Sequence, residues 1–173
     1  MSLRSILLVA AAMLVACAAQ VAAQQSLGEL VSENGYDWII GKWATSEEGE
    51  KTEAEYKWGL DKHIILVDVK RGDFKYHGII MFVPSREEVI QIGADNQGGV
   101  WKGTWSAEND SAVYKMEHIR PDGEIRKYEF VHSQVNADTM KVAMYAVEDT
   151  GSRASEPRAT PIYKRQTSGD PKK

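Results

Sequence analysis

The sequence has little of what several classes of protein need. It contains one cysteine among 173 residues, which excludes an internal disulfide framework and a zinc site built from cysteines. Its 21 basic residues are outnumbered by 25 acidic ones and form no basic run, which argues against nucleic acid as a partner. It also lacks a glycine-rich phosphate loop, a nucleophile elbow and a kinase motif set. What remains is a mildly acidic globular protein.

Residues 1–23 are typical of a secretory signal peptide. They carry one positive charge, at Arg4, then an apolar stretch from Ile6 to Val15, and then small residues up to Ala23. The apolar stretch is too short to cross about 30 Å of hydrocarbon, and no later segment has the roughly 20 apolar residues of a spanning helix. The sequence therefore predicts export to the periplasm or the medium, without a membrane span.

Two cleavage sites are open. Val21-Ala22-Ala23 suits an ordinary signal peptidase, whereas Leu14-Val15-Ala16-Cys17 resembles a lipobox, which would make Cys17 the lipidated first residue of an anchored lipoprotein. We favour the first site, because the signal-like composition continues past Cys17. The soluble product would then begin at Gln24 and retain no cysteine.

Nine turn-like breaks divide the rest of the chain into ten short segments. The breaks are Glu48-Gly49-Glu50, Asp61-Lys62, Arg71-Gly72-Asp73, Pro84-Ser85-Arg86-Glu87, Asp95 to Gly99, Glu108-Asn109-Asp110, Pro121-Asp122-Gly123, Asn136-Ala137-Asp138, and Glu148 to Pro157. The segments are rich in β-branched and aromatic residues, and several alternate polar and apolar residues as half-buried strands do. A helical pattern is confined to residues 24–36, which we expect to form a short cap. The tail, residues 166–173, has the composition of a disordered segment.

The clearest hairpin is built around Pro121-Asp122-Gly123. Proline presets the first turn dihedral and glycine accepts the left-handed position of a three-residue loop, which pairs Arg120 with Glu124. This register predicts an inward face made of Tyr114, Met116, His118, Arg126, Tyr128, Phe130 and His132. The opposite face is expected to be largely solvated and carries Val113, Lys115, Glu117, Lys127, Glu129 and Val131.

Ten short antiparallel strands leave two unpaired edges unless the sheet closes on itself. We therefore predict an all-β fold, an up-and-down antiparallel barrel over residues 37–165, in a monomer. An open two-sheet sandwich is the alternative, because a local pattern does not establish closure.

The first and last predicted strands carry a family resemblance. Gly41-Lys42-Trp43 opens the first strand and Arg165 ends the last, and together they resemble the lipocalin or calycin pattern. That resemblance implies that Trp43 packs across the closed end of the barrel and that Arg165 lies over its ring. Further segments, from His77-Gly78-Ile79 through the stretch at 95–105 to Asp122-Gly123, are similar to exported bacterial lipocalin-like domains of unknown function.

The chain also resembles the nitrobindin-like barrels, which bind haem. The resemblance implies a haem-ligating histidine near the last strand, but the segment from Arg158 to Arg165 has none, so we predict no haem and no other cofactor. The four histidines, at His63, His77, His118 and His132, form no metal-binding spacing, and we predict no metal site.

Two sets of residues are candidates for a site. His118, Arg126 and Tyr128 share the predicted inward face, where they could hold a carboxylate or polarise a carbonyl, although we favour the simpler interpretation, a buried polar network near the hairpin turn. Rings and one thioether could border an apolar pocket or simply pack the core, and this set comprises Trp58, Trp101, Trp105, Tyr114, Met116, Tyr128 and Phe130.

Three functions follow from these candidates. The first is binding of a small apolar or amphiphilic molecule inside the barrel, with Arg126 meeting an acid group on it. The second is an enzyme with isomerase-type acid–base chemistry, using His118, Tyr128 and Arg126; the analogy with other barrels is the only support for it. The third is an interaction module of the cell envelope whose barrel is filled by side chains.

Overall fold

The computed structural model describes residues 25–47 and 49–166. The strands of this part of the chain are β1 (Gly41–Glu47), β2 (Glu50–Gly59), β3 (Ile64–Arg71), β4 (Phe74–Val83), β5 (Glu88–Asp95), β6 (Val100–Glu108), β7 (Ser111–Ile119), β8 (Ile125–Asn136), β9 (Thr139–Ala146) and β10 (Ile162–Arg165). The helices are α2 (Leu27–Glu33) and the 3-10 helices η1 (Asp37–Ile39) and η2 (Pro84–Arg86). The ten strands match the ten predicted segments.

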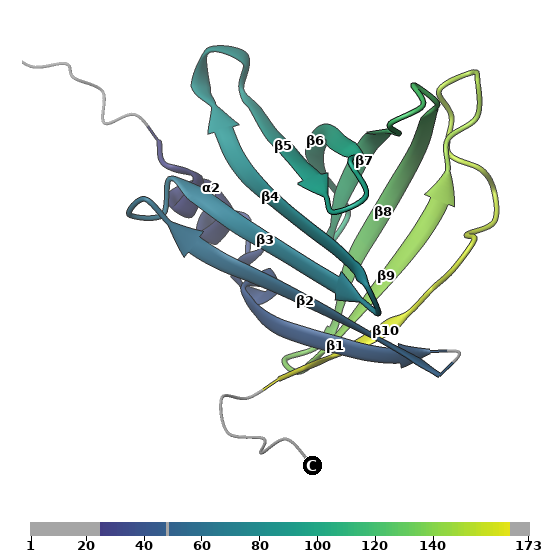
Figure 1. The fold of residues 1–173 in the computed structure, drawn as a ribbon. Coiled ribbons are helices and arrows are strands. Elements are labelled where there is room, and N and C mark those ends of the chain that lie inside the picture. The colour runs from purple at the N-terminus through teal and green to yellow at the C-terminus, as the bar shows by residue number, and fades with distance from the viewer. Residues whose placement is uncertain (1–24, 48, 167–173) are drawn as a thin grey trace, which may run out of the picture.

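The strands form one closed antiparallel barrel (Figure 1). Each strand pairs with its neighbours in sequence, and β1 pairs with β10 through Trp43 opposite Arg165 and Ala44 opposite Lys164. The predicted all-β barrel is confirmed. The open sandwich is wrong, because β1 and β10 each have a paired strand on both sides. This architecture is compatible with a lipocalin-like or calycin-like fold.

The hairpin of β7 and β8 has the predicted register. The backbone N–H of Arg120 donates to the carbonyl of Glu124 at 2.9 Å, and Gly123 takes the left-handed conformation with a φ of 86°. Opposite pairs on the two strands are Ala112 and His132, Tyr114 and Phe130, Met116 and Tyr128, and His118 and Arg126. Turn chemistry alone therefore fixed the pairing of two strands.

Helix α2 closes one end of the barrel. A capping box begins it: the backbone N–H of Glu29 donates to Ser26 Oγ at 3.2 Å, and the Glu29 carboxylate accepts the Ser26 N–H at 2.7 Å. Leu27 on its inner face is 1% exposed and packs in the core, and the N–H of Gly28 donates to the carbonyl of Lys62 at 2.9 Å. The helix is thereby tied to the β2–β3 turn, at what we name the closed end; the opposite end is the mouth.

Trp43 and Arg165 join the two ends of the strand order at the closed end. The Trp43 ring is 1% exposed, its Nε1 donates to the carbonyl of Ile39 at 2.9 Å, and the Arg165 guanidinium carbon lies 4.2 Å from the ring centroid. Arg165 also donates to the carbonyls of Ile40 and Trp38 at 2.9 and 2.7 Å. A planar cation stacked on an indole, with its donors satisfied by carbonyls, locks the first strand to the last.

Gly41 is required beside this contact. Its φ is 137°, a backbone conformation that L side chains rarely adopt, and a Cβ added there would run into the Arg165 guanidinium. Both ends of the short motif Gly41-Lys42-Trp43 are therefore required by the packing of Arg165: Gly41 leaves room for the guanidinium, and Trp43 provides the ring on which it lies.

The predicted solvation of the outer hairpin face is wrong at two positions. Val113 is 4% exposed and Glu129 is 8% exposed. The segment between β9 and β10, residues 147–161, runs outside this part of the barrel (Figure 1), and its Arg153 pairs with Glu129 at 2.9 Å and with Glu108 at 3.0 Å. We call this segment the β9–β10 connector.

Candidate functional site

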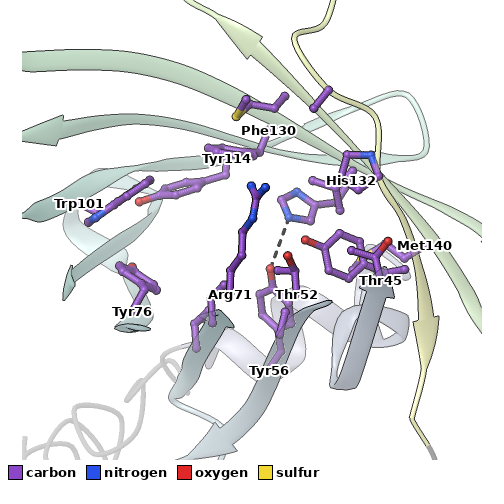
Figure 2. Close-up of a pocket in the computed structure, with 18 of the residues that line it drawn as sticks. Thr45, Thr52, Tyr56, Arg71, Tyr76, Trp101, Tyr114, Phe130, His132 and Met140 are labelled. Carbon is purple, nitrogen blue, oxygen red and sulfur yellow. Dashed lines mark hydrogen bonds between the residues drawn. The ribbon is translucent and has the colours of Figure 1, made fainter. Parts of the chain in front are cut away.

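The barrel encloses a cavity of about 330 Å³. Apolar and aromatic side chains dominate its wall, and Figure 2 shows them converging from opposite sides of the barrel. The aromatic lining residues are Tyr56, Phe74, Tyr76, Trp101, Trp105, Tyr114, Phe130 and Tyr163. A cavity of this size and lining is of the kind that holds one small molecule.

The structure divides the predicted pocket residues into two groups. Four of the predicted residues line the cavity, and these are Trp101, Trp105, Tyr114 and Phe130. Trp58, Met116 and Tyr128 do not line it: Trp58 packs against the buried core cluster, Met116 is 2% exposed, and the Tyr128 ring lies under Arg158 at 5.9 Å. Alternation places a residue on the inner face of a strand, but it does not say how deep in the barrel that residue lies.

A chain of hydrogen bonds orients one side of the cavity. Trp105 Nε1 donates to Gln91 Oε1 at 2.8 Å, and Gln91 Nε2 donates to the Tyr76 hydroxyl at 2.8 Å. Gln91 is 5% exposed. These two hydrogen bonds therefore satisfy both of its side-chain polar atoms inside the barrel. Burial raises the pKa of Tyr76, although the hydrogen bond from Gln91 lowers it in part. The phenol therefore stays neutral at physiological pH.

Trp105 also stacks on Tyr114 in the wall of the cavity. Their ring centroids are 5.0 Å apart with planes 15° from parallel, and both rings come from paired positions of β6 and β7. The Tyr114 hydroxyl is buried with no hydrogen-bond partner among the described residues, and burial raises the pKa of this phenol. The pair presents a flat apolar wall to the cavity.

His132 is a lining residue that the predicted pocket set omitted. It is 5% exposed, and its Nε2 lies 3.4 Å from the Tyr56 hydroxyl across the barrel (Figure 2). Burial lowers the pKa of His132 to about 4, so the ring is neutral at physiological pH. Its position on the inward face of the hairpin was the one signal in the sequence that pointed to it.

The structure does not bring His118, Arg126 and Tyr128 together around the cavity. Arg126 is exposed, and its Nε donates to Glu124 at 2.8 Å. The His118 ring stacks on Trp101, with centroids 4.1 Å apart, and its Nε2 lies 3.2 Å from Asp95 Oδ2 in an orientation that makes no hydrogen bond. None of these three side chains lines the cavity.

Asp95 holds Trp101 in the cavity wall. Its Oδ1 accepts the backbone N–H groups of Gln97 and Gly99 at 2.9 and 2.8 Å, and its Oδ2 accepts Trp101 Nε1 at 2.7 Å. Burial opposes ionisation of Asp95, but these hydrogen bonds and the nearby His118 lower its pKa below the ordinary value. The carboxylate therefore has a structural role in the β5–β6 turn.

Two charged residues of the lining, Glu50 and Arg71, lie at the mouth. Arg71 Nε donates to Glu50 Oε2 at 2.7 Å, and both side chains are about half exposed. In Figure 2 the Arg71 side chain points inward over the cavity. The sequence placed Arg71 in a turn with Gly72 and Asp73 and gave no sign of this orientation.

The described residues hold no group of three histidine, cysteine, aspartate or glutamate side chains placed to bind a metal ion. Among the same residues, no helix has both the length and the apolar character needed to cross a membrane. The sequence matches no protein-family model, and no curated protein is detectably similar to it.

Proposed function

We propose that this protein binds one small, mainly apolar molecule inside the barrel. The observation that carries the proposal is the cavity of about 330 Å³ with its wall of aromatic rings. Rigid rings offer a large apolar contact area and lose little conformational entropy on binding. The same cavity counts against a barrel filled by its own side chains, the third of the functions considered above.

The polar groups inside the cavity favour a ligand whose buried part is uncharged. His132 and the Tyr56 and Tyr76 phenols are all neutral at physiological pH, and each has a hydrogen-bonding atom at the wall. Burying an unpaired ion against neutral groups is costly, whereas a hydroxyl or carbonyl group needs one hydrogen bond. No comparable observation favours the enzyme hypothesis, because its three proposed residues do not share the cavity.

The test is a binding screen with the intact protein. Quenching of tryptophan fluorescence reports binding directly, since Trp101 and Trp105 line the cavity. We expect at least one member of a panel of decanol, decanoate, retinol and 2-naphthol to bind with saturation, and native mass spectrometry of protein purified from its own host to show a bound small molecule. Absence of both signals would contradict the proposal.

A cavity-filling variant locates the ligand. Ala54 lines the cavity and is 7% exposed, so Ala54→Phe places a ring inside it. We expect at least a tenfold loss of affinity for the best probe, with a destabilisation of no more than about 1–3 kcal/mol, the usual cost of enlarging a side chain in a packed core. Titration and urea denaturation measure the two effects.

The matched control is Ala94→Phe, which adds the same ring on an exposed position of β5. It should leave the affinity unchanged. If Ala54→Phe binds the probe as the wild type does, the ligand is held elsewhere on the protein.

We also propose that the protein is exported and that residues 1–23 are removed. These residues, the candidate lipidation site Cys17 and most of the predicted disordered tail lie outside the described residues, and the proposal rests on the sequence pattern of the signal. Mass spectrometry of the mature protein should find Gln24 at its N-terminus. A diacylglyceryl group on Cys17 would instead show an anchored lipoprotein, and an intact Met1 would contradict export with cleavage.

A further inference from the structure

The charge of the cavity wall is confined to the mouth. Among the lining residues that the structure describes, the ionised side chains are Glu50 and Arg71, at the mouth ends of β2 and β3. Farther inside, His132 and the phenols of Tyr56, Tyr76 and Tyr114 are neutral at physiological pH. A charged group on a ligand therefore finds a counter-charge at the mouth and none beneath it.

Arg71 is the charged side chain directed over the cavity. It ends β3, opposite Thr52 of β2 and Phe74 of β4, and its side chain points inward, toward the space between Tyr114 and His132 (Figure 2). The contact with Glu50 at 2.7 Å uses Nε, on the stem side of the guanidinium. A guanidinium carries five N–H donors in a planar fork, so it accommodates a carboxylate in two parallel hydrogen bonds together with another partner.

The ion pair between Arg71 and Glu50 does not prevent Arg71 from binding a carboxylate of a ligand. The Arg71 and Glu50 side chains are 54% and 47% exposed. Ion pairs between exposed side chains contribute little to stability and are readily replaced. A carboxylate that is brought to the mouth by the burial of its own apolar tail can therefore compete with Glu50 and any other partner of Arg71 for the guanidinium.

Building on the proposed function, we propose that the ligand is an apolar monocarboxylate: its tail lies in the aromatic cavity and Arg71 binds its carboxylate at the mouth. This assigns to Arg71 the role that the sequence analysis predicts for Arg126. Arg126 is exposed, is paired with Glu124 at 2.8 Å, and does not line the cavity. Arg71 thereby becomes the residue that distinguishes an acid from a neutral molecule of the same shape.

The experiment compares three ligands with one tail and different heads: decanoate, decanol and decylamine. Calorimetric titration of the wild type should show decanoate binding at least tenfold tighter than decanol, with decylamine weakest. Arg71→Gln should remove this preference and leave decanol affinity within twofold of the wild type. Arg71→Lys keeps the charge but loses the planar fork, and should retain part of the preference. The matched control Arg126→Gln should behave as the wild type.

The outcomes separate this inference from the proposed function. Equal binding of decanoate and decanol by the wild type, or a preference for decanoate that survives Arg71→Gln, overturns the role of Arg71 and leaves the cavity as a binding site. A preference for decylamine overturns it in favour of Glu50 as the selecting charge. If the wild type binds none of the three, the monocarboxylate inference fails, and the wider panel and the Ala54→Phe variant decide on the cavity.

Discussion

Trp43→Ala is expected to destabilise the barrel by about 3–5 kcal/mol, the range measured when a large buried aromatic side chain is truncated. Trp43 is 1% exposed, and the change removes its hydrogen bond to Ile39 and the surface on which the Arg165 guanidinium lies at 4.2 Å. Urea denaturation followed by far-ultraviolet circular dichroism measures the loss. We expect Trp43→Phe, which keeps a ring, to lose clearly less.

A double-mutant cycle isolates the contact between Trp43 and Arg165. Arg165→Ala alone should be destabilising, since it also removes hydrogen bonds to the carbonyls of Trp38 and Ile40. The coupling energy between the two substitutions should be about 0.5–2 kcal/mol, the range of a cation stacked on an aromatic ring. A loss under 1 kcal/mol for Trp43→Ala would contradict the role assigned to this ring.

Acid is expected to destabilise the protein through His132 by roughly 3 kcal/mol between pH 6.5 and about 4. Burial lowers the pKa of this ring in the folded protein to about 4, whereas the unfolded chain takes up the proton near pH 6.5. Between these values the unfolded state binds more protons, so the free energy of unfolding falls as the pH falls. Above pH 6.5 His132 is neutral in both states, and the protein keeps all of this stability.

The measurement is urea denaturation at half-unit steps from pH 7.5 to pH 4, on the wild type and on His132→Gln. The variant should show a flatter pH profile over this window, whatever its stability at pH 7.5. Asp95 does not confuse the result, because its lowered pKa puts its own loss of stability below the ordinary value of 3.8. Equal slopes for the wild type and His132→Gln would contradict the prediction.

The sequence predicted those features of the fold that depend on local chemistry. Pro121 and Gly123 determine a three-residue loop, and the loop sets the register from Ala112 opposite His132 to His118 opposite Arg126. Period-two alternation marks the strands, and the number of turn-like breaks gives their number. Closure followed from a general argument about free edges, which the pairing of β1 with β10 confirms.

Features that depend on distant segments were not predictable in this way. Val113 and Glu129 are buried beside a connector whose path no local pattern reveals. The inward row of the hairpin includes Arg126, but alternation does not distinguish the mouth of a barrel from its interior, and there the long side chain turns to Glu124 instead. The sequence places Arg71 in a turn but does not predict its orientation, because the direction of a flexible side chain at a strand end depends on the neighbouring strands.

The joint between β1 and β10 has a consequence for the timing of folding. The Arg165 guanidinium holds the carbonyl of Ile40, 125 residues earlier in the chain, so the last strand completes the ring that the first one began. Neighbouring hairpins can form while the ribosome is still at work, but the ring is completed only after residue 165 has emerged. Until then the paired strands can form only an open sheet, in which β1 keeps one edge free for the strand that arrives last.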